Sequence, residues 1–231
     1  MKLVKNIIFQ ISFYSVTTIF AFLSLIFLFF PRKYILYSLK IWSNYLSILL
    51  YLIFRINYRI EGKFTQSQVI YAIQHQSVWE TIILADQLPG IQAIIMKKEL
   101  INIPIIGWLF KHSGAVPLDR GKKIESMRKL LSESEKAVKR GDNLIIFPQG
   151  TRIKPGEKNK FLPGVYAIYK HLDLPVIPIA LNSGKFWFGT EINGPGCIKV
   201  LILDTIQPGL KRMDFMNKLE STIENASKRL L

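Results

Sequence analysis

A run of 24 residues without a charged side chain, residues 7–30, constrains this chain more than any other feature of its sequence. A helix of that length is about 36 Å long, enough to cross the ~30 Å of hydrocarbon in a bilayer. A second apolar segment, residues 34–54, carries Trp42 and Tyr51, and such aromatic side chains are typical of the membrane–water interface. We therefore predict that residues 1–60 form a membrane-associating segment of two hydrophobic helices.

The sequence leaves open how this segment meets the membrane. A single span followed by an interfacial helix, a two-helix hairpin inserted into one leaflet, and a buried core helix of a soluble protein are the alternatives. Lys2 and Lys5 flank the first run on one side and Arg32, Lys33 and Lys40 follow it on the other, so the flanking charges do not decide. A cleaved signal peptide is disfavoured, because the run is longer than a signal-peptide core and no small-residue cleavage site follows it.

The charge balance indicates an anionic partner. The chain has 31 Lys and Arg against 16 Asp and Glu, a formal net charge of +15. Anionic lipids, nucleic acid and acidic proteins or substrates would all complement this charge. The basic residues are scattered rather than grouped in a nucleic-acid-binding module. Together with the apolar segment, they predict a lipid bilayer containing anionic lipids as the partner, and no nucleic acid.

Cysteine and histidine usage narrows the chemistry. The single cysteine, Cys197, excludes an intramolecular disulfide framework and a cysteine-based zinc site. His75, His112 and His171 lack the spacing of metal ligands, so we expect no metal. The chain also lacks the G-x-S-x-G motif of serine hydrolases, the phosphate-binding G-x4-G-K-S/T loop and the dinucleotide-binding G-x-G-x-x-G motif.

From about residue 66 onward, short β-branched runs alternate with helical patterns. The expected strands are 68–74, 91–96, 114–118, 143–147, 176–181 and 198–203, and the expected helices are 78–88, 122–140, 163–172 and 211–230. This alternation is typical of α/β proteins, so we predict a mixed, mostly parallel sheet flanked by helices for residues 61–231. The loop 148–162 carries no secondary-structure signal, and long loops of this kind are usually functional.

A histidine and a carboxylate stand where the first of these strands gives way to a helix. His75 follows the strand, and Glu80 lies five positions later. Histidine is the usual general base near neutral pH, and a carboxylate can hold its tautomer and stabilise the imidazolium. Five positions place the two on different faces of a helix, so they can meet only if His75 lies in the turn before it. Ser77 and Glu80 also match a helix capping box, which is an alternative reason for the glutamate.

Basic residues follow three other expected strands. Lys97, Arg120 and Arg152 each stand at or just beyond a strand end, and Gly150 allows the backbone before Arg152 to approach a ligand closely. Each motif taken alone also fits a surface salt bridge or an ordinary turn. Ligands of α/β sheets bind at the carboxyl ends of the strands. Together the motifs therefore predict a phosphate-binding site beside His75.

In their order and spacing, these motifs resemble those of the glycerolipid acyltransferases, over about residues 65–185. The family's His-x4-Asp is matched by His75 to Glu80, its block ending in Asp-Arg by residues 114–120, its Phe-Pro-Glu-Gly-Thr-Arg by residues 147–152, and its late Val-Pro strand by residues 174–179. The family's Lys-x-Glu-Leu, followed by Ile-Pro and Gly, is matched by residues 97–100, Ile103-Pro104 and Gly107.

The resemblance is strongest to the members that acylate lysophosphatidic acid. It implies the glycerolipid acyltransferase fold and transfer of a fatty acyl group from acyl-carrier protein or coenzyme A to the sn-2 hydroxyl of lysophosphatidic acid, giving phosphatidic acid for phospholipid synthesis. It also implies that His75 is the base, that Glu80 orients it and that no cofactor is needed beyond the acyl donor. The expected location is the cytoplasmic face of the inner (plasma) membrane, where acyl donors are made.

The remaining site residues follow from the same resemblance. The expected phosphate-binding residues are Arg120, Arg152 and Lys97, the expected substrate loop holds Gln149, Gly150 and Thr151, and the expected acyl path includes Ile103, Pro104, Gly107 and Pro178.

Two residues depart from the family's pattern. Glu80 replaces an aspartate and keeps the carboxylate on a longer side chain. Gln149 replaces a glutamate, which would harm activity if the glutamate acts through its charge. We favour a role in hydrogen bonding, because a neutral amide avoids repulsion with a phosphate. Two alternatives stay open: an acyltransferase for another lysolipid acceptor, and a catalytically weakened lipid-binding protein of the membrane.

Overall fold

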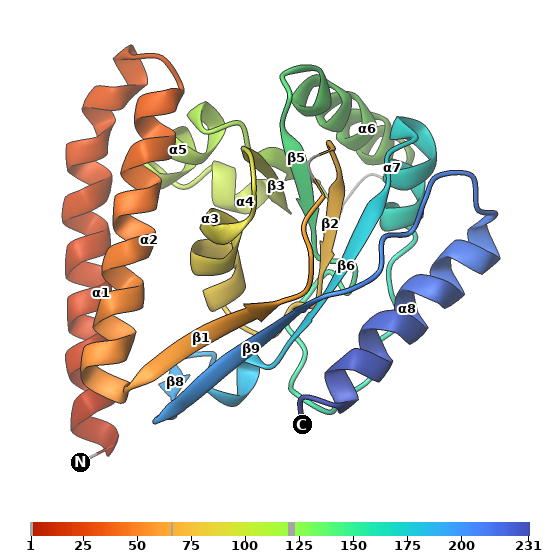
Figure 1. Cartoon of the computed structure of the whole chain (residues 1–231). Coiled ribbons are helices and arrows are strands. Elements are labelled where there is room, and N and C mark those ends of the chain that lie inside the picture. The colour runs from red at the N-terminus through yellow and green to blue at the C-terminus, as the bar shows by residue number, and fades with distance from the viewer. Residues whose placement is uncertain (1, 66, 120–122) are drawn as a thin grey trace.

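The structure combines an apolar helical hairpin with a seven-stranded sheet. Figure 1 shows the computed structural model, which describes residues 2–65, 67–119 and 123–231. The helices are α1 (Lys2–Ser24), α2 (Lys33–Phe54), α3 (Ala85–Gln87), α4 (Lys98–Ile101), α5 (Ile106–His112), α6 (Lys123–Lys139), α7 (Gly164–Leu172) and α8 (Arg212–Lys228). The strands are β1 (Ile56–Glu61), β2 (Ile70–Ile73), β3 (Gln92–Lys97), β4 (Val116–Leu118), β5 (Asn143–Ile146), β6 (Val176–Leu181), β7 (Trp187–Phe188), β8 (Glu191–Ile192) and β9 (Gly196–Ile202). Shorter helical turns are η1 (Leu25–Phe29), η2 (Glu80–Leu84) and η3 (Ser183–Lys185).

The main sheet is mixed and mostly parallel, as the sequence predicted. Its strand order is β1-β9-β6-β2-β5-β3-β4, and every neighbouring pair is parallel except β6 with β9. The strands β7 and β8 form a separate antiparallel hairpin. Because β2, β5, β3 and β4 run side by side in one direction, the segments that follow them emerge at the same edge of the sheet.

Helices cover both faces of this sheet. Figure 1 shows α1 and α2 on one side and α6, α7 and α8 on the other. In β2, Tyr71 and Ile73 pack into the core on the α1–α2 side, while Ile70 and Ala72 pack into the core under α6–α8. Burial on both faces explains why β2 is a continuous hydrophobic run rather than an alternating one.

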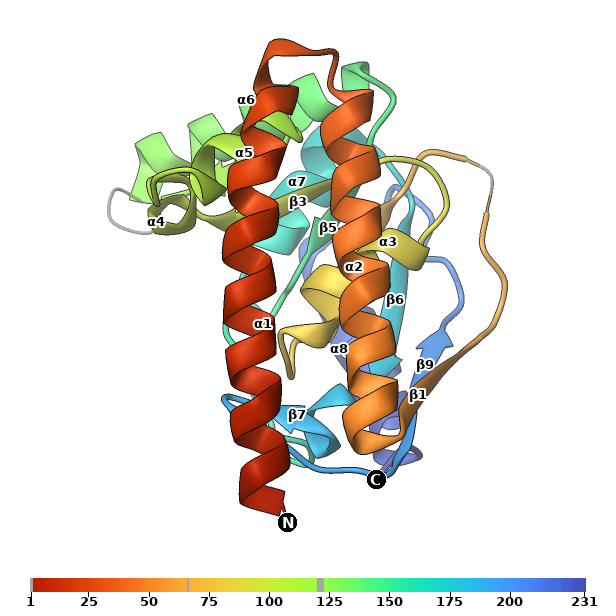
Figure 2. The ribbon, with the colours of Figure 1, turned by 90° about the vertical axis from the view of Figure 1, so that its left-hand side faces the viewer.

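The hairpin of α1 and α2 presents two different surfaces. Figure 2 shows the two helices side by side along the domain. Lys2–Phe29 and Lys33–Phe54 are each long and apolar enough to cross a membrane, with mean hydropathies of 2.1 and 1.2. The inner surface packs into the domain core through Phe9, Leu46 and Leu50. The outer surface leaves large apolar side chains in the open, and Phe29 is 90% exposed.

Polar contacts tie both ends of the hairpin to the domain. At the turn between the helices, Arg32 donates two hydrogen bonds to the carboxylate of Asp142, at 2.8 and 2.9 Å, and a third to the carbonyl of Ser113. Asp142 is only 1% exposed. Near the start of α1, the Asn6 side chain exchanges two hydrogen bonds with the backbone of Ile192. The hairpin therefore lies against the domain over its whole length.

Two features lay outside the elements expected from the sequence. The strand β1 begins at Ile56, inside the segment 1–60 assigned to the hydrophobic helices, and pairs in parallel with β9. It is an edge strand whose residues after Ile56 alternate between exposed and half-buried, so it gives no continuous apolar signal. The short β7–β8 hairpin also follows no recognisable run.

Candidate active site

The side chains of His75 and Glu80 meet at the carboxyl end of β2. His75 lies in the turn after the strand, and Glu80 begins the helical turn η2. The His75 Nδ1 and the Glu80 Oε1 are 3.0 Å apart. The five-residue spacing allows the two side chains to meet only if His75 lies before the helix, and the structure places it there.

Glu80 is a fully buried carboxylate with four hydrogen-bond donors. Its Oε1 accepts from the backbone amides of Gln76 and Ser77, both at 2.6 Å, as well as from His75. Its Oε2 accepts from the Ser183 hydroxyl at 2.7 Å. Burying a charge is costly unless such donors replace its hydration. The capping-box contact and the histidine contact, weighed as alternatives, thus coexist on one carboxylate.

This arrangement defines which nitrogen of His75 can act as a base. An ionised carboxylate can only accept, so His75 donates from Nδ1, and Nε2 then carries the lone pair. The ring stacks on Phe147 at 4.2 Å between centroids. The histidine side chain is 13% exposed. The imidazole is therefore oriented by two contacts and still open to a substrate.

The loop after β5 holds the backbone of His75 from both sides. The Gln149 Oε1 accepts from the His75 amide at 2.7 Å, and the His75 carbonyl accepts from the Ile153 amide at 2.9 Å. Between them, Gly150 adopts a left-handed φ of 69°, which favours glycine. Gln149 is buried and uses its amide oxygen as an acceptor, which is a function that a glutamate could also perform.

Two of the three basic residues expected to bind phosphate, Arg152 and Lys97, follow strands that end at the same edge of the sheet as β2. Arg152 is exposed and directly precedes Ile153, whose amide contacts His75. Lys97 is exposed at the end of β3, two strands away from β2. Its neighbour Lys98 pairs with Asp119 at 3.0 Å. Arg120 lies outside the described residues.

The four residues expected along an acyl path do not form one group. Ile103 and Pro104 are exposed in the turn between α4 and α5. Gly107 is buried where α5 meets α4, and a Cβ there would lie 2.1 Å from the Ile101 carbonyl oxygen. Pro178 lies within β6, separated from β3 by β2 and β5.

Two contacts of the site were not anticipated from the sequence. Ser183, which binds Glu80, is fully buried, and the adjacent Gly184 donates its amide to the Gln76 side chain at 3.0 Å. Both follow the end of β6, so the strand-end reasoning that found Lys97 and Arg152 could have found them as well. Among the described residues, no three His, Cys, Asp or Glu side chains gather closely enough to hold a metal ion.

Comparisons with known proteins agree with this geometry. The family model described as Acyltransferase matches residues 55–182. The 1-acyl-sn-glycerol-3-phosphate acyltransferase of Pseudomonas aeruginosa is 30% identical over 70% of this chain and 63% of its own length. The chloroplastic LPAT1 of Arabidopsis thaliana, which carries the same enzyme name, is 31% identical over 83% of this chain and 54% of its own length. The chain thus spans about half to two thirds of these curated relatives.

A solved structure supports the fold. The crystal structure of the 1-acyl-sn-glycerophosphate (LPA) acyltransferase PlsC from Thermotoga maritima superposes with a TM-score of 0.80 at 20% identity, covering 100% of this chain and 98% of that one. The shared architecture includes the N-terminal helices as well as the sheet. Since the family model also covers more than half of the sequence, the chain belongs to the Acyltransferase family.

Proposed function

We propose that this chain transfers a fatty acyl group from a thioester of coenzyme A or acyl-carrier protein to the sn-2 hydroxyl of lysophosphatidic acid, giving phosphatidic acid for phospholipid synthesis. The observation that carries the proposal is the contact of His75 with the buried Glu80, at 3.0 Å, in a chain of this family. The names of its relatives supply the acceptor.

The reaction proceeds without an acyl-enzyme. The Nε2 of His75 takes the proton from the acceptor hydroxyl as its oxygen attacks the thioester carbonyl. The imidazolium that forms is stabilised by the carboxylate of Glu80. Collapse of the tetrahedral intermediate breaks the carbon–sulfur bond, and the imidazolium returns its proton to the departing thiolate. General base catalysis of this kind contributes typically ~10²–10⁴ in rate, and binding the two substrates together adds to it. We propose that no cofactor takes part.

The basic residues near His75 bind the phosphate group of the acceptor. Arg152 is held next to the base by the bond from Ile153 to the His75 carbonyl. A guanidinium matches the geometry of a phosphate group, and Lys97 adds a second positive charge at the same edge. The positive charge of the chain also suits coenzyme A and acyl-carrier protein, which are both anionic.

The acceptor and the product are lipids, and we propose that the hairpin brings the site to the bilayer by lying in one leaflet. The contacts of Asn6 with Ile192 and of Arg32 with Asp142 bind both ends of the hairpin to the domain. A bilayer-spanning hairpin would draw the sheet beside it, with its exposed edge, into hydrocarbon. If only the outer surface of the hairpin enters the hydrocarbon of one leaflet, the sheet stays outside it and its polar edge remains hydrated. The expected side is the cytoplasmic face of the inner membrane.

An acyl-transfer assay tests the proposed activity. Purified protein in mixed micelles receives labelled oleoyl-coenzyme A or oleoyl-acyl-carrier protein together with lysophosphatidic acid. His75→Ala should abolish formation of phosphatidic acid. His171→Ala is the matched control, because the His171 ring lies beside a surface carboxylate, that of Glu135, at 3.5 Å, and does not take part in the contacts of His75 described above. Absence of product with either donor from folded wild-type protein would refute the proposal, and other lysolipids would then be tested as acceptors.

A further inference from the structure

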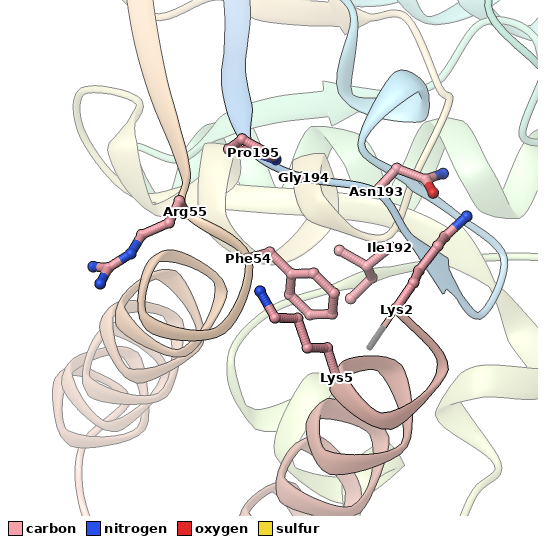
Figure 3. A pocket seen from close by; sticks show the side chains of 8 residues that line it. All are labelled: Lys2, Lys5, Phe54, Arg55, Ile192, Asn193, Gly194 and Pro195. Carbon is pink, nitrogen blue, oxygen red and sulfur yellow. The ribbon is translucent and has the colours of Figure 1, made fainter.

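A hollow lies away from His75, at the end of the hairpin where α1 begins and α2 ends. Figure 3 shows it from close by. Its volume is about 390 Å³. It is lined by Lys2, Lys5, Phe54, Arg55, Ile192, Asn193, Gly194 and Pro195. None of these residues takes part in the candidate active site.

Three basic side chains surround this hollow. Lys2 and Lys5 extend from the first turns of α1 over it, and Arg55 stands at the opposite edge with its guanidinium turned outward (Figure 3). Within residues 2–65, 67–119 and 123–231, no ion pair joins any of the three to a carboxylate. Their charges are therefore available to an external anion.

Helix stability does not account for Lys2 and Lys5. The first turn of α1 contains no acidic residue, and lysines there oppose the positive end of the helix dipole. Arg55 ends α2 in a left-handed conformation with a φ of 56°, a position that glycine or asparagine usually takes. The charges of Lys2 and Lys5 thus oppose the helix dipole, whereas the charge of Arg55 suits the end of α2 and only its backbone conformation is unusual. Residues that break a local rule are a common sign of function.

The floor of the hollow is apolar and closely built. Phe54 and Ile192 are 5% and 0% exposed. Gly194 packs so tightly that a Cβ would lie 2.2 Å from the Phe54 carbonyl oxygen. This glycine lets the segment before β9 close against the end of α2 and form the wall.

An apolar groove of about 430 Å³ adjoins the hollow and shares Lys2 with it. It runs between α1 and the β7–β8 hairpin and is lined by Lys2, Leu3, Asn6, Ile7, Gln10, Ile11, Thr190 and Glu191. Leu3 and Ile11 are 73% and 62% exposed, on the surface that we place in the leaflet. A free anion in water would need no such apolar neighbour.

We propose that this end of the hairpin binds an anionic phospholipid, with the phosphate group at Lys2 and Lys5 and one acyl chain along the groove of Leu3, Ile7 and Ile11. The lipid is bound and not transformed. The inference rests on the proposed placement of the hairpin in a leaflet and is independent of acyl transfer. Free phosphate shares the chemistry of the headgroup, and the experiment separates the two.

Lysine footprinting tests the site directly. The protein is treated with an amine-acylating reagent in the presence of neutral phosphatidylcholine vesicles, of vesicles containing phosphatidylglycerol, or of inorganic phosphate, and modified lysines are identified by mass spectrometry. Lys2 and Lys5 should be protected several-fold more by the anionic vesicles than by the neutral ones, while Lys129 and Lys218 stay unprotected. Equal protection by both vesicles, or by inorganic phosphate alone, would overturn the proposal.

Two variants then distinguish binding of a phospholipid in this hollow from general electrostatic attraction of the basic chain to an anionic membrane. Lys2→Gln/Lys5→Gln should weaken binding to anionic vesicles by roughly 30-fold, whereas Lys129→Gln/Lys218→Gln carries the same change in charge and should retain it. Asn193→Trp fills the hollow, keeps both lysines and should lose the preference for anionic vesicles. Retention of the preference by Asn193→Trp would overturn the site. Failure of the wild type to bind any vesicle would overturn the leaflet placement and this site with it, and would leave acyl transfer in micelles standing.

Discussion

Replacing Glu80 by glutamine would measure how much the buried carboxylate contributes to proton transfer. The charge of Glu80 faces the His75 Nδ1 at 3.0 Å. At an effective dielectric constant of ~20, a full charge at that distance stabilises the imidazolium by about 5 kcal/mol. That energy corresponds to a rate factor of about 10⁴, which matches the loss seen when the carboxylate of a Ser-His-Asp triad becomes an amide. We therefore expect kcat to fall by about 10³–10⁴ in Glu80→Gln.

The experiment has to separate the loss of the Glu80 charge from any loss of folding. Glutamine keeps an oxygen for the three donors that meet at Oε1, so thermal unfolding should show a folded variant. Steady-state acylation of lysophosphatidic acid gives kcat and KM, and the loss should appear in kcat. Ser183→Ala removes only the 2.7 Å bond to Oε2 and should lower kcat by much less. A fall of less than tenfold in a folded Glu80→Gln variant would refute the role given to this carboxylate.

Three further perturbations test other parts of the structure. Gln149→Glu should keep activity within a few-fold, because it retains the oxygen that accepts from the His75 amide. Gln149→Ala should lower the free energy of unfolding by about 1–3 kcal/mol and lose most of kcat. Equal activities of the two variants would contradict this role of Gln149. Asp142→Ala leaves Arg32 without its buried partner and should lower the free energy of unfolding by about 3–5 kcal/mol, read from denaturant unfolding. Burial raises the pKa of Asp86, so the fold prefers its protonated form and stability falls as pH rises through that pKa. Asp86→Asn should therefore be at least as stable as the wild type at pH 7 and lose this advantage at pH 3; a variant less stable at pH 7 would contradict it.

Much of the fold follows from patterns that the sequence displays. The strand expected at 176–181 has the bounds of β6, and the helix expected at 122–140 contains α6 and ends one residue beyond it. Both are long segments with a single strong periodicity. The strand β1 was not predicted, because it is an edge strand whose residues after Ile56 are exposed or half-buried and form no continuous apolar run.

In the candidate site, too, some contacts could be predicted from the sequence and others could not. The meeting of His75 with Glu80 was predictable, because a turn between strand and helix offers few geometries. The contact of Ser183 with Glu80 spans 103 positions in sequence and depends on β6 lying beside β2, which local patterns do not reveal. The buried acceptor role of Gln149 depends in the same way on β5 and β2 being neighbours. Long-range strand order, rather than residue type, was the missing information.

The two-sided character of the hairpin bears on how this protein can be handled. Phe9, Leu46 and Leu50 belong to the same core as Tyr71 and Trp79. Removing residues 1–54 to obtain a soluble enzyme would therefore strip one face of the sheet and yield an aggregating fragment. Solubility has to be sought on the outer surface instead, by replacing side chains such as Phe29 and leaving the inner face intact. For the same reason, a protease that removes the hairpin of α1 and α2 would inactivate the protein instead of releasing an active domain.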